Sequence, residues 1–216
     1  MELKCIYGIN YDSNIYVING EKPSIIDTGT GLHHKRVINE IKKYIDIKKI
    51  NQIILTHEHF DHTGGIEKLK NDTSEDVKII SHKKAATKIE KGESHFAKML
   101  GAEMNCITVD IKLEEGDKIQ IGDKQWNVLS TPGHTPGSIS LYEETSKSLI
   151  SGDTIFSNGS FGRYDLPGGD PYLLKKSIAR LSNLDIKNLY PGHENIVENY
   201  AKSHIEKTLQ NINYML

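Results

Sequence analysis

The chain has 216 residues, of which 37% are hydrophobic and 26% charged, and its formal net charge at pH 7 is -2. This composition describes an ordinary globular protein, long enough to bury a substantial core, and it argues against a basic nucleic-acid-binding surface. No run of about twenty apolar residues is present to cross a bilayer. We expect a single domain over residues 1–216.

The amino terminus, MELKCIYGIN, lacks the apolar core of a secretory signal, so we expect a cytoplasmic protein. The expected partner is a small-molecule substrate, with no nucleic acid and no membrane. The chain is expected to be a monomer or a small homo-oligomer. Because Cys5 and Cys106 form no CxxC pair, we expect neither a disulfide framework nor cysteine metal ligands.

The amino-terminal part of the sequence predicts four strands and one helix. Segments rich in β-branched and aromatic residues predict strands, and apolar residues at helical spacing between Val37 and Ile45 predict a helix. In chain order we expect strands at 2–9, 14–20 and 23–27, a helix at 32–45 and a strand at 51–56.

The rest of the sequence predicts further blocks of strands with helices between them. In order we expect a helix at 66–71, a strand at 77–81, a helix at 83–91, strands within 106–142 and at 148–153, a helix at 171–183 capped by Asp170, a strand at 186–190 and a helix at 199–214. Residues 92–105 have weak periodicity and form either a lid or an ordinary helix. Because helices fall between blocks of strands, we expect two sheets packed face to face with helices outside.

The segment THEHFDH, residues 56–62, concentrates three His and one Asp after an apolar run. Burying such a cluster is costly unless a partner such as a metal ion replaces the lost water. In a strand that turns into a loop, His57, His59 and Asp61 would occupy alternate positions while His62 points elsewhere. Two neighbouring ions could share the four side chains. The alternative is a solvated surface loop, or an Asp that caps the following helix.

Three more segments end a predicted strand with a short turn and one polar side chain. VLSTPGH ends with His134, LISGD with Asp153 and NLYPGH with His193. A Pro-Gly or Ser-Gly turn stops a strand and fixes the direction of the next residue, which suits a rigid ligand. Each residue alone could be an ordinary surface residue or a cap. Together with THEHFDH they make seven donors, about the number that two metal ions with open positions for water require.

With these motifs in this order over nearly the whole chain, the sequence resembles the metallo-β-lactamase superfamily of αββα sandwich hydrolases. The resemblance implies an α/β fold of two mixed β-sheets with helices on the outer faces. It also implies two divalent metal ions, with zinc expected and iron or a mixed zinc–iron pair as alternatives. The implied ligands are His57, His59 and His134 for the first ion, Asp61, His62 and His193 for the second, and Asp153 as the bridge between them.

Within the superfamily, the segments at 152–156, 161–170 and 190–194 are most similar to compact glyoxalase II-type thioesterases, the hydroxyacylglutathione hydrolase-like group. Asp27, in IIDTG, matches an early Asp of the family and is implied to support a ligand from behind. Arg163 stands where the family places a residue that contacts the carrier part of the substrate, which implies substrate binding. The alternative for Arg163 is a structural pair with a nearby Asp.

The resemblance to glyoxalase II enzymes fails at the end of the chain. Those enzymes carry a carboxy-terminal helical domain that binds glutathione, and a Tyr follows their GHE motif. Here Asn195 follows GHE and few residues remain after His193. We therefore expect no separate glutathione-binding domain, and the sequence leaves the thiol carrier open.

The implied reaction is hydrolysis of a small thioester or a related acyl compound by a metal-bound hydroxide that Asp61 helps to orient. One alternative is a persulfide dioxygenase with a single iron held by His57, His134 and Asp153. Another is a lactonase or other ester hydrolase, because the same hydroxide would open an ester ring. A nucleic-acid-processing enzyme is disfavoured by the slightly acidic charge balance.

Overall fold

The first half of the chain forms a six-stranded mixed sheet in the order β1-β2-β3-β4-β5-β6. In the computed structural model, which describes residues 3–216, β1 pairs with β2 and β2 with β3 in antiparallel fashion, whereas β3 to β6 are parallel. The strands are β1 (Leu3–Ile6), β2 (Ile15–Ile18), β3 (Ser24–Ile26), β4 (Gln52–Leu55), β5 (Lys78–His82) and β6 (Ile111–Leu113).

The second half forms a five-stranded sheet in the order β11-β10-β9-β8-β7. Neighbouring strands are antiparallel except β10 and β11, which are parallel, so this sheet is also mixed. The strands are β7 (Lys118–Ile121), β8 (Lys124–Ser130), β9 (Ile139–Glu143), β10 (Ser148–Gly152) and β11 (Asn188–Pro191).

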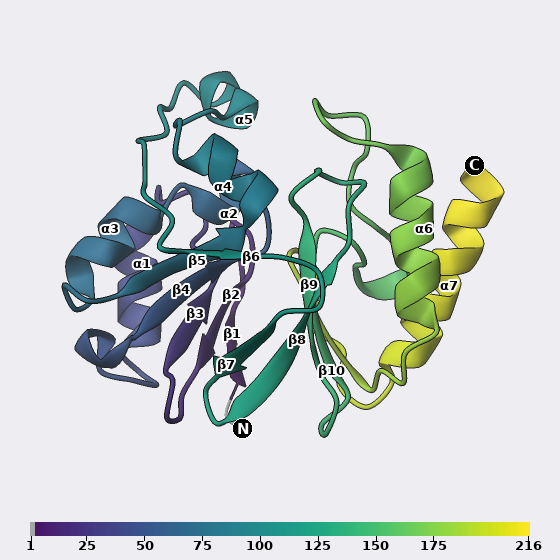
Figure 1. The fold of residues 1–216 in the computed structure, drawn as a ribbon, viewed down its shortest axis with the longest axis horizontal. Coiled ribbons are helices and arrows are strands. Elements are labelled where there is room, and N and C mark those ends of the chain that lie inside the picture. The colour runs from purple at the N-terminus through teal and green to yellow at the C-terminus, as the bar shows by residue number, and fades with distance from the viewer. Residues whose placement is uncertain (1–2) are drawn as a thin grey trace.

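Helices cover the outer face of each sheet, as Figure 1 shows. Helices from the first half of the chain lie on the side of the first sheet, and the last two lie against the second. They are α1 (His34–Ile41), α2 (Phe60–Thr63), α3 (Ile66–Asp72), α4 (Lys83–Ile89), α5 (His95–Met99), α6 (Pro171–Ser182) and α7 (Ala201–Met215). The predicted αββα sandwich of two mixed sheets is confirmed. None of the described helices has the length and apolar character needed to span a membrane.

Alternating side chains of the central strands pack into two separate hydrophobic cores. On β4, Ile53 points into the core beneath the helices of the first half, and Ile54 into the core between the two sheets. Both are fully buried, as expected for a strand covered on both faces. Trp126, also fully buried, fills the middle of the core between the sheets. A third core lies between the second sheet and α6 and α7.

Two local predictions were wrong. The first strand within 106–142 was expected over residues 106–113 but begins only at Ile111. The preceding backbone bonds elsewhere, because Ile107 N–H donates to the carbonyl of Ile89 and Val109 N–H to the Glu90 carboxylate. The segment after β4 is not a loop throughout, because Phe60–Thr63 forms one turn of helix. By contrast, the predicted cap of α6 is confirmed, since the Asp170 side chain accepts hydrogen bonds from the first turn.

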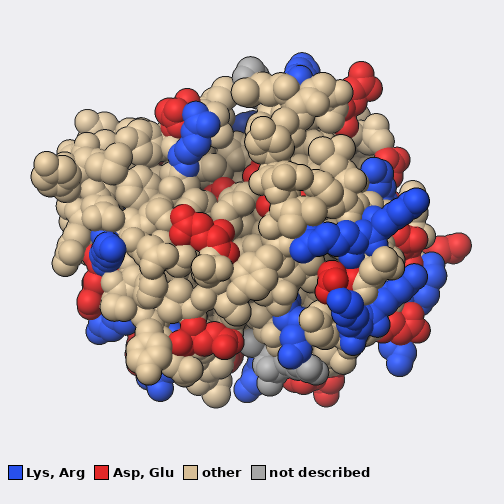
Figure 2. Space-filling model, turned by 180° about the vertical axis from the view of Figure 1, so that it is seen from behind, with Lys and Arg blue, Asp and Glu red and all other residues tan. Residues whose placement is uncertain are grey.

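Charged side chains are mixed on the surface. On the face shown in Figure 2, Lys and Arg alternate with Asp and Glu over the side that carries the first sheet. Lys42 and Lys43, at the end of α1, are exposed, and Lys43 pairs with Glu40. A mixture of this kind suits a solvated surface better than a continuous basic footprint.

Candidate metal centre

The predicted donors meet where four strands end. The segment after β4 supplies four of them, and the turns after β8, β10 and β11 supply one each. The seven donors form two adjoining groups, and within each group the candidate ligand atoms lie within 4.8 Å of one another. The groups are His57, His59 and His134, and Asp61, His62, Asp153 and His193.

The first group consists of three imidazoles with converging nitrogens. Nδ1 of His59 lies 2.8 Å from Nε2 of His134, which lies 3.2 Å from Nε2 of His57. Nitrogens about 2.0–2.1 Å from a tetrahedral zinc ion would be separated by about 3.3 Å. The three nitrogens are therefore close to the spacing that one ion requires.

The second group combines two carboxylates with two imidazoles. Nε2 of His193 lies 3.1 Å from Oδ2 of Asp61, and Nε2 of His62 lies 3.2 Å from Oδ1 of Asp153. The alternation expected for an extended strand, with His57, His59 and Asp61 on one side, does not hold at Asp61, whereas the implied grouping of Asp61 with His62 and His193 is found. The turn of helix α2 moves it to the same side as His62.

Asp153 lies between the two groups. Its Oδ1 faces His62, and its Oδ2 lies 3.4 Å from Nε2 of His134 in the first group and 3.6 Å from Nε2 of His193. One carboxylate thus faces donors of both groups. This is the position from which a bridging ligand would act.

Two atoms of the second group support a fit to metal ions. His62 Nε2 and Asp153 Oδ1 are buried, and apart from each other neither has a hydrogen-bond partner. A buried polar atom without a partner is costly, and the two point toward each other at 3.2 Å. A cation that accepts a lone pair from each would satisfy both, so the donor set fits a divalent ion.

Asp27 lies behind both groups. Its carboxylate accepts hydrogen bonds from Thr56 N–H and Oγ1–H, each at 2.8 Å, and contacts Nδ1 of His62 at 2.8 Å. Thr56 Oγ1 lies 3.1 Å from Nδ1 of His57. With Nδ1–H donating in both rings, each ring turns its Nε2 toward the site, where the deprotonated nitrogen would bind a metal ion. This role of Thr56 was not predicted from the sequence, although Thr56 is the first residue of the THEHFDH segment.

Arg163 contacts the centre through its backbone. Nδ1 of His134 lies 2.6 Å from the carbonyl oxygen of Arg163, which fixes the tautomer that leaves Nε2 free. The guanidinium instead forms two hydrogen bonds to the Asp165 carboxylate at 2.9 and 2.8 Å. The Arg163–Asp165 pair corresponds to the structural role that was predicted as the alternative to substrate binding.

Burial keeps His57 and His59 of the first group neutral. Burial, followed by the charges of His62 and His134, holds the pKa of His57 well below 6.5. Burial, with His134 next, lowers the pKa of His59 to about 3. Neutral imidazole is the form that binds a metal ion, so His57 and His59 are ready to ligate at neutral pH.

Opposite charges govern the second group. Burial alone would lower the pKa of His62, but the carboxylates around it, Asp153 first, outweigh that effect and raise the pKa well above 6.5. Burial alone would raise the pKa of Asp153, but His62 and His193 outweigh it and hold the pKa well below its usual range. Asp153 is therefore ionised and able to bind cations.

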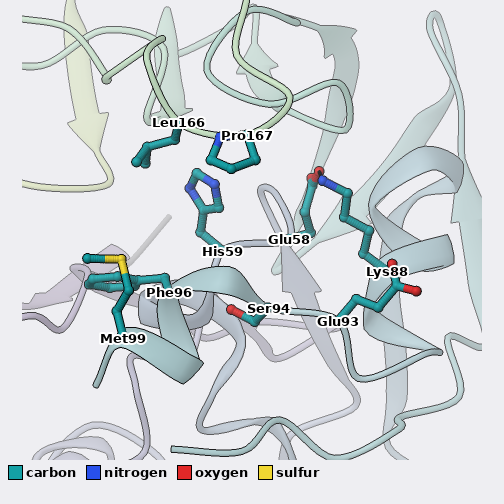
Figure 3. Close-up of a pocket in the computed structure, with 9 residues that line it drawn as sticks. All are labelled: Glu58, His59, Lys88, Glu93, Ser94, Phe96, Met99, Leu166 and Pro167. Carbon is teal, nitrogen blue, oxygen red and sulfur yellow. Dashed lines mark ion pairs between the residues drawn. The ribbon is translucent and has the colours of Figure 1, made fainter. Parts of the chain in front are cut away.

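Glu58, between His57 and His59 in the chain, is a buried carboxylate that the sequence analysis did not single out. Its Oε2 accepts a hydrogen bond from Thr135 Oγ1 at 2.8 Å, and its Oε1 lies 3.3 Å from Nζ of Lys88 on α4. Figure 3 shows this pair beside His59. The pair links α4 to the ligand-bearing segment.

A two-sheet sandwich with paired His and Asp groups at the strand ends is the architecture of a metallo-hydrolase. The chain belongs to the metallo-β-lactamase superfamily, whose family model matches residues 9–193. It is 38% identical over 204 residues to a probable metallo-hydrolase of Methanocaldococcus jannaschii, covering 91% of this chain and 95% of that protein. It is 32% identical to the hydroxyacylglutathione hydrolase of Rhodopseudomonas palustris over 70% of this chain, but over only 51% of that enzyme.

Two solved structures share the fold across most of their length. The BLEG-1 B3 metallo-β-lactamase superposes with a TM-score of 0.77 at 27% identity, covering 99% of both chains. TTHA1623, solved in a di-iron-bound form, superposes with a TM-score of 0.74 at 30% identity, covering 90% of this chain and 94% of that one.

Proposed function

We propose that this protein is a metal-dependent hydrolase of small thioesters or related acyl compounds. The observation that carries the proposal is the pair of adjoining donor groups with Asp153 facing both. Such a pair suits two divalent ions a few ångströms apart, as in two-metal hydrolases. We expect zinc, with iron or a zinc–iron pair as the alternatives, since the similar TTHA1623 was solved with two irons.

The proposed roles of the donors follow from their grouping. His57, His59 and His134 would hold the first ion, Asp61, His62 and His193 the second, and Asp153 both. Two bound ions would supply a water of lowered pKa as the nucleophile and would polarise the acyl oxygen.

Two carboxylates would control this chemistry from the protein side. Asp61, whose Oδ2 lies 3.1 Å from Nε2 of His193, would orient a water molecule as well as bind metal. Asp27 would keep His62 in the tautomer that ligates. No Ser or Cys nucleophile is needed.

The preference for thioesters rests on similarity to hydroxyacylglutathione hydrolases and on the segments between Gly152 and Glu194 that resemble them. Because the chain matches only about half of those enzymes, the thiol carrier is left open. We keep the single-iron persulfide dioxygenase as the rival. The atoms that it would use, on His57, His134 and Asp153, also lie together here.

The test combines metal analysis with turnover. Protein purified without added metal is first analysed for zinc and iron. It is then assayed for thiol release from acyl-thioesters, which tests the proposed function. Opening of lactones, opening of a chromogenic β-lactam and oxygen uptake with a persulfide test the alternatives. We expect two ions per chain and thiol release. His134→Ala, which removes a donor of the first group, should keep about one ion per chain and lose thiol release. His204→Ala, which changes a histidine on α7 outside the two groups, should keep both ions and the activity. One iron per chain with oxygen uptake and no thiol release would overturn the proposal, as would turnover of the β-lactam alone.

A further inference from the structure

A cavity of about 250 Å³ opens directly onto both donor groups, and much of its remaining wall is apolar. His59 and His134 of the first group, and Asp61, Asp153 and His193 of the second, form one end. The apolar side chains of the wall are Phe96, Met99, Phe156, Phe161 and Leu166, which we call the apolar slot. A substrate that reaches the centre must therefore place some group against these side chains.

The apolar slot has two walls from distant parts of the chain. Phe96 and Met99 come from α5, and the other three residues come from the segment after β10. Figure 3 shows His59 with Phe96 and Met99 on one side and Leu166 on the other. Phe156 brings the apolar slot into contact with the metal centre, because its ring packs edge to face against that of His193 with the ring centroids 5.8 Å apart.

The cations around the slot are already paired. Among the described residues that line this cavity and a smaller adjoining one, the basic side chains are Arg163 and Lys88. Arg163 binds Asp165 through two hydrogen bonds, and Lys88 pairs with the buried Glu58. An anionic group in the slot would have to compete with these carboxylates, whereas an uncharged apolar group would not.

The volume also limits the occupant. Pockets for drug-sized ligands usually measure about 300–1,000 Å³. A cavity of about 250 Å³ suits a short aliphatic or aromatic group and is small for a whole thioester with its carrier. Common thiol carriers are polar or charged, so the apolar group that fits the slot is the acyl group.

Building on the proposed function, we propose that the apolar slot binds an uncharged aliphatic or aromatic acyl group of about four to eight carbons, next to the metal centre. Acyl binding there would remove both the substrate and side chains such as Met99, now 68% exposed, from water. The acyl chain would thus determine specificity, and the thiol carrier would contribute little.

The first experiment measures kcat/KM for thioesters of one small neutral thiol whose acyl chain grows from acetyl to octanoyl. Burial of a methylene group is worth about a fourfold gain, so we expect kcat/KM to rise by up to about fourfold per added carbon until the slot is full. A succinyl thioester, which carries a charge at its end, should react at least tenfold more slowly than the neutral acyl group of equal length.

A binding measurement separates this inference from the proposed function. The straight-chain carboxylates from acetate to octanoate are titrated calorimetrically into the protein as purified, and the longer ones should bind more tightly. Thiol release that does not depend on chain length would overturn the slot and leave the hydrolase standing. Tighter binding of longer carboxylates without any thioester turnover would support the slot and overturn the thioesterase.

Two matched variants locate the effect. Met99→Ser removes an exposed apolar side chain of the slot, and Met215→Ser removes one that is 58% exposed at the end of α7. Both should fold, because neither side chain is buried. We expect Met99→Ser to reduce the octanoyl-to-acetyl ratio of kcat/KM at least fivefold and Met215→Ser to leave it unchanged. Equal ratios in the two variants would overturn the assignment.

Discussion

The Asp27 carboxylate lies 2.8 Å from Nδ1 of His62, a residue 35 positions away in the chain. Because Asp27 also accepts two hydrogen bonds from Thr56, it holds the ligand-bearing segment and one candidate ligand at the same time. Asp27→Asn keeps the shape but replaces one acceptor with a donor. We expect metal affinity to fall by about 10- to 100-fold, as measured by competition with a chelating dye.

The control for this change is Asp12→Asn. Asp12 is also a buried carboxylate near the amino terminus, but it bonds to Thr30 and His33 and has no place in the two donor groups. Its substitution should lower stability without changing metal affinity. Equal losses of affinity in the two variants would show that Asp27 acts only through general stability.

The two donor groups should lose metal separately. His193→Ala removes one of four donors from the second group and touches none in the first, so we expect the metal content to fall from two ions per chain to about one. His59→Ala should likewise empty the first group. Elemental analysis after dialysis measures both, and loss of both ions in both variants would mean that the groups form one indivisible site.

Gly192 should tolerate no side chain. A Cβ at this position would lie 2.1 Å from Oδ1 of Asp153 and 2.8 Å from a ring carbon of His62. Gly192→Ala should therefore displace the carboxylate that faces both groups and abolish metal binding. The control is Gly116→Ala, where a Cβ meets nothing within 4 Å and only the positive φ of 86° is strained, at roughly 1–2 kcal/mol. Its metal content should be unchanged.

Removal of metal should lower thermal stability. Apart from each other, the buried atoms His62 Nε2 and Asp153 Oδ1 have no hydrogen-bond partner, so a bound ion would stabilise the folded state in which they converge. At a metal concentration of about 100 times Kd, binding contributes about 2.7 kcal/mol, which for a chain of this size corresponds to a Tm shift of about 5–10 °C. Calorimetric scans with and without a chelator measure it, and an unchanged Tm would argue against ligation.

The turn between β9 and β10 should respond to acid. Burial alone would raise the pKa of Glu143, but hydrogen bonds from Ser146 and Thr145 outweigh it and hold the pKa below 4.5. A depressed folded-state pKa gives stability that is present above about pH 4.5 and is lost as the pH falls through the folded value. Urea unfolding should therefore show a smaller loss of stability between about pH 5 and 3 in Glu143→Gln than in the unchanged protein.

Much of the fold and the position of the centre could be predicted because each donor follows a local signal. Pro-Gly turns place His134 and His193 at strand ends, and alternating apolar residues such as Ile53 and Ile54 identify a strand buried on both faces. These signals depend on neighbours in the chain. They place residues at one edge of a sandwich without tertiary information.

The rest depends on contacts between distant residues. The one-turn helix that places Asp61 beside His62 has no side-chain hydrogen bond at its N-cap, so no local capping signal predicts it. Phe96 and Met99 belong to a segment of weak periodicity, so their place over the centre is decided by where α5 packs. The role of Arg163 as a carbonyl acceptor for His134 could not be read from its side chain at all.

The donors are divided between the two halves of the sandwich. Those from His57 to His62 come from the first sheet, whereas His134, Asp153 and His193 come from the second, and each donor group contains members from both. Neither half alone can assemble either group. We therefore expect a bound ion to join the two halves through side chains of both and to slow their separation.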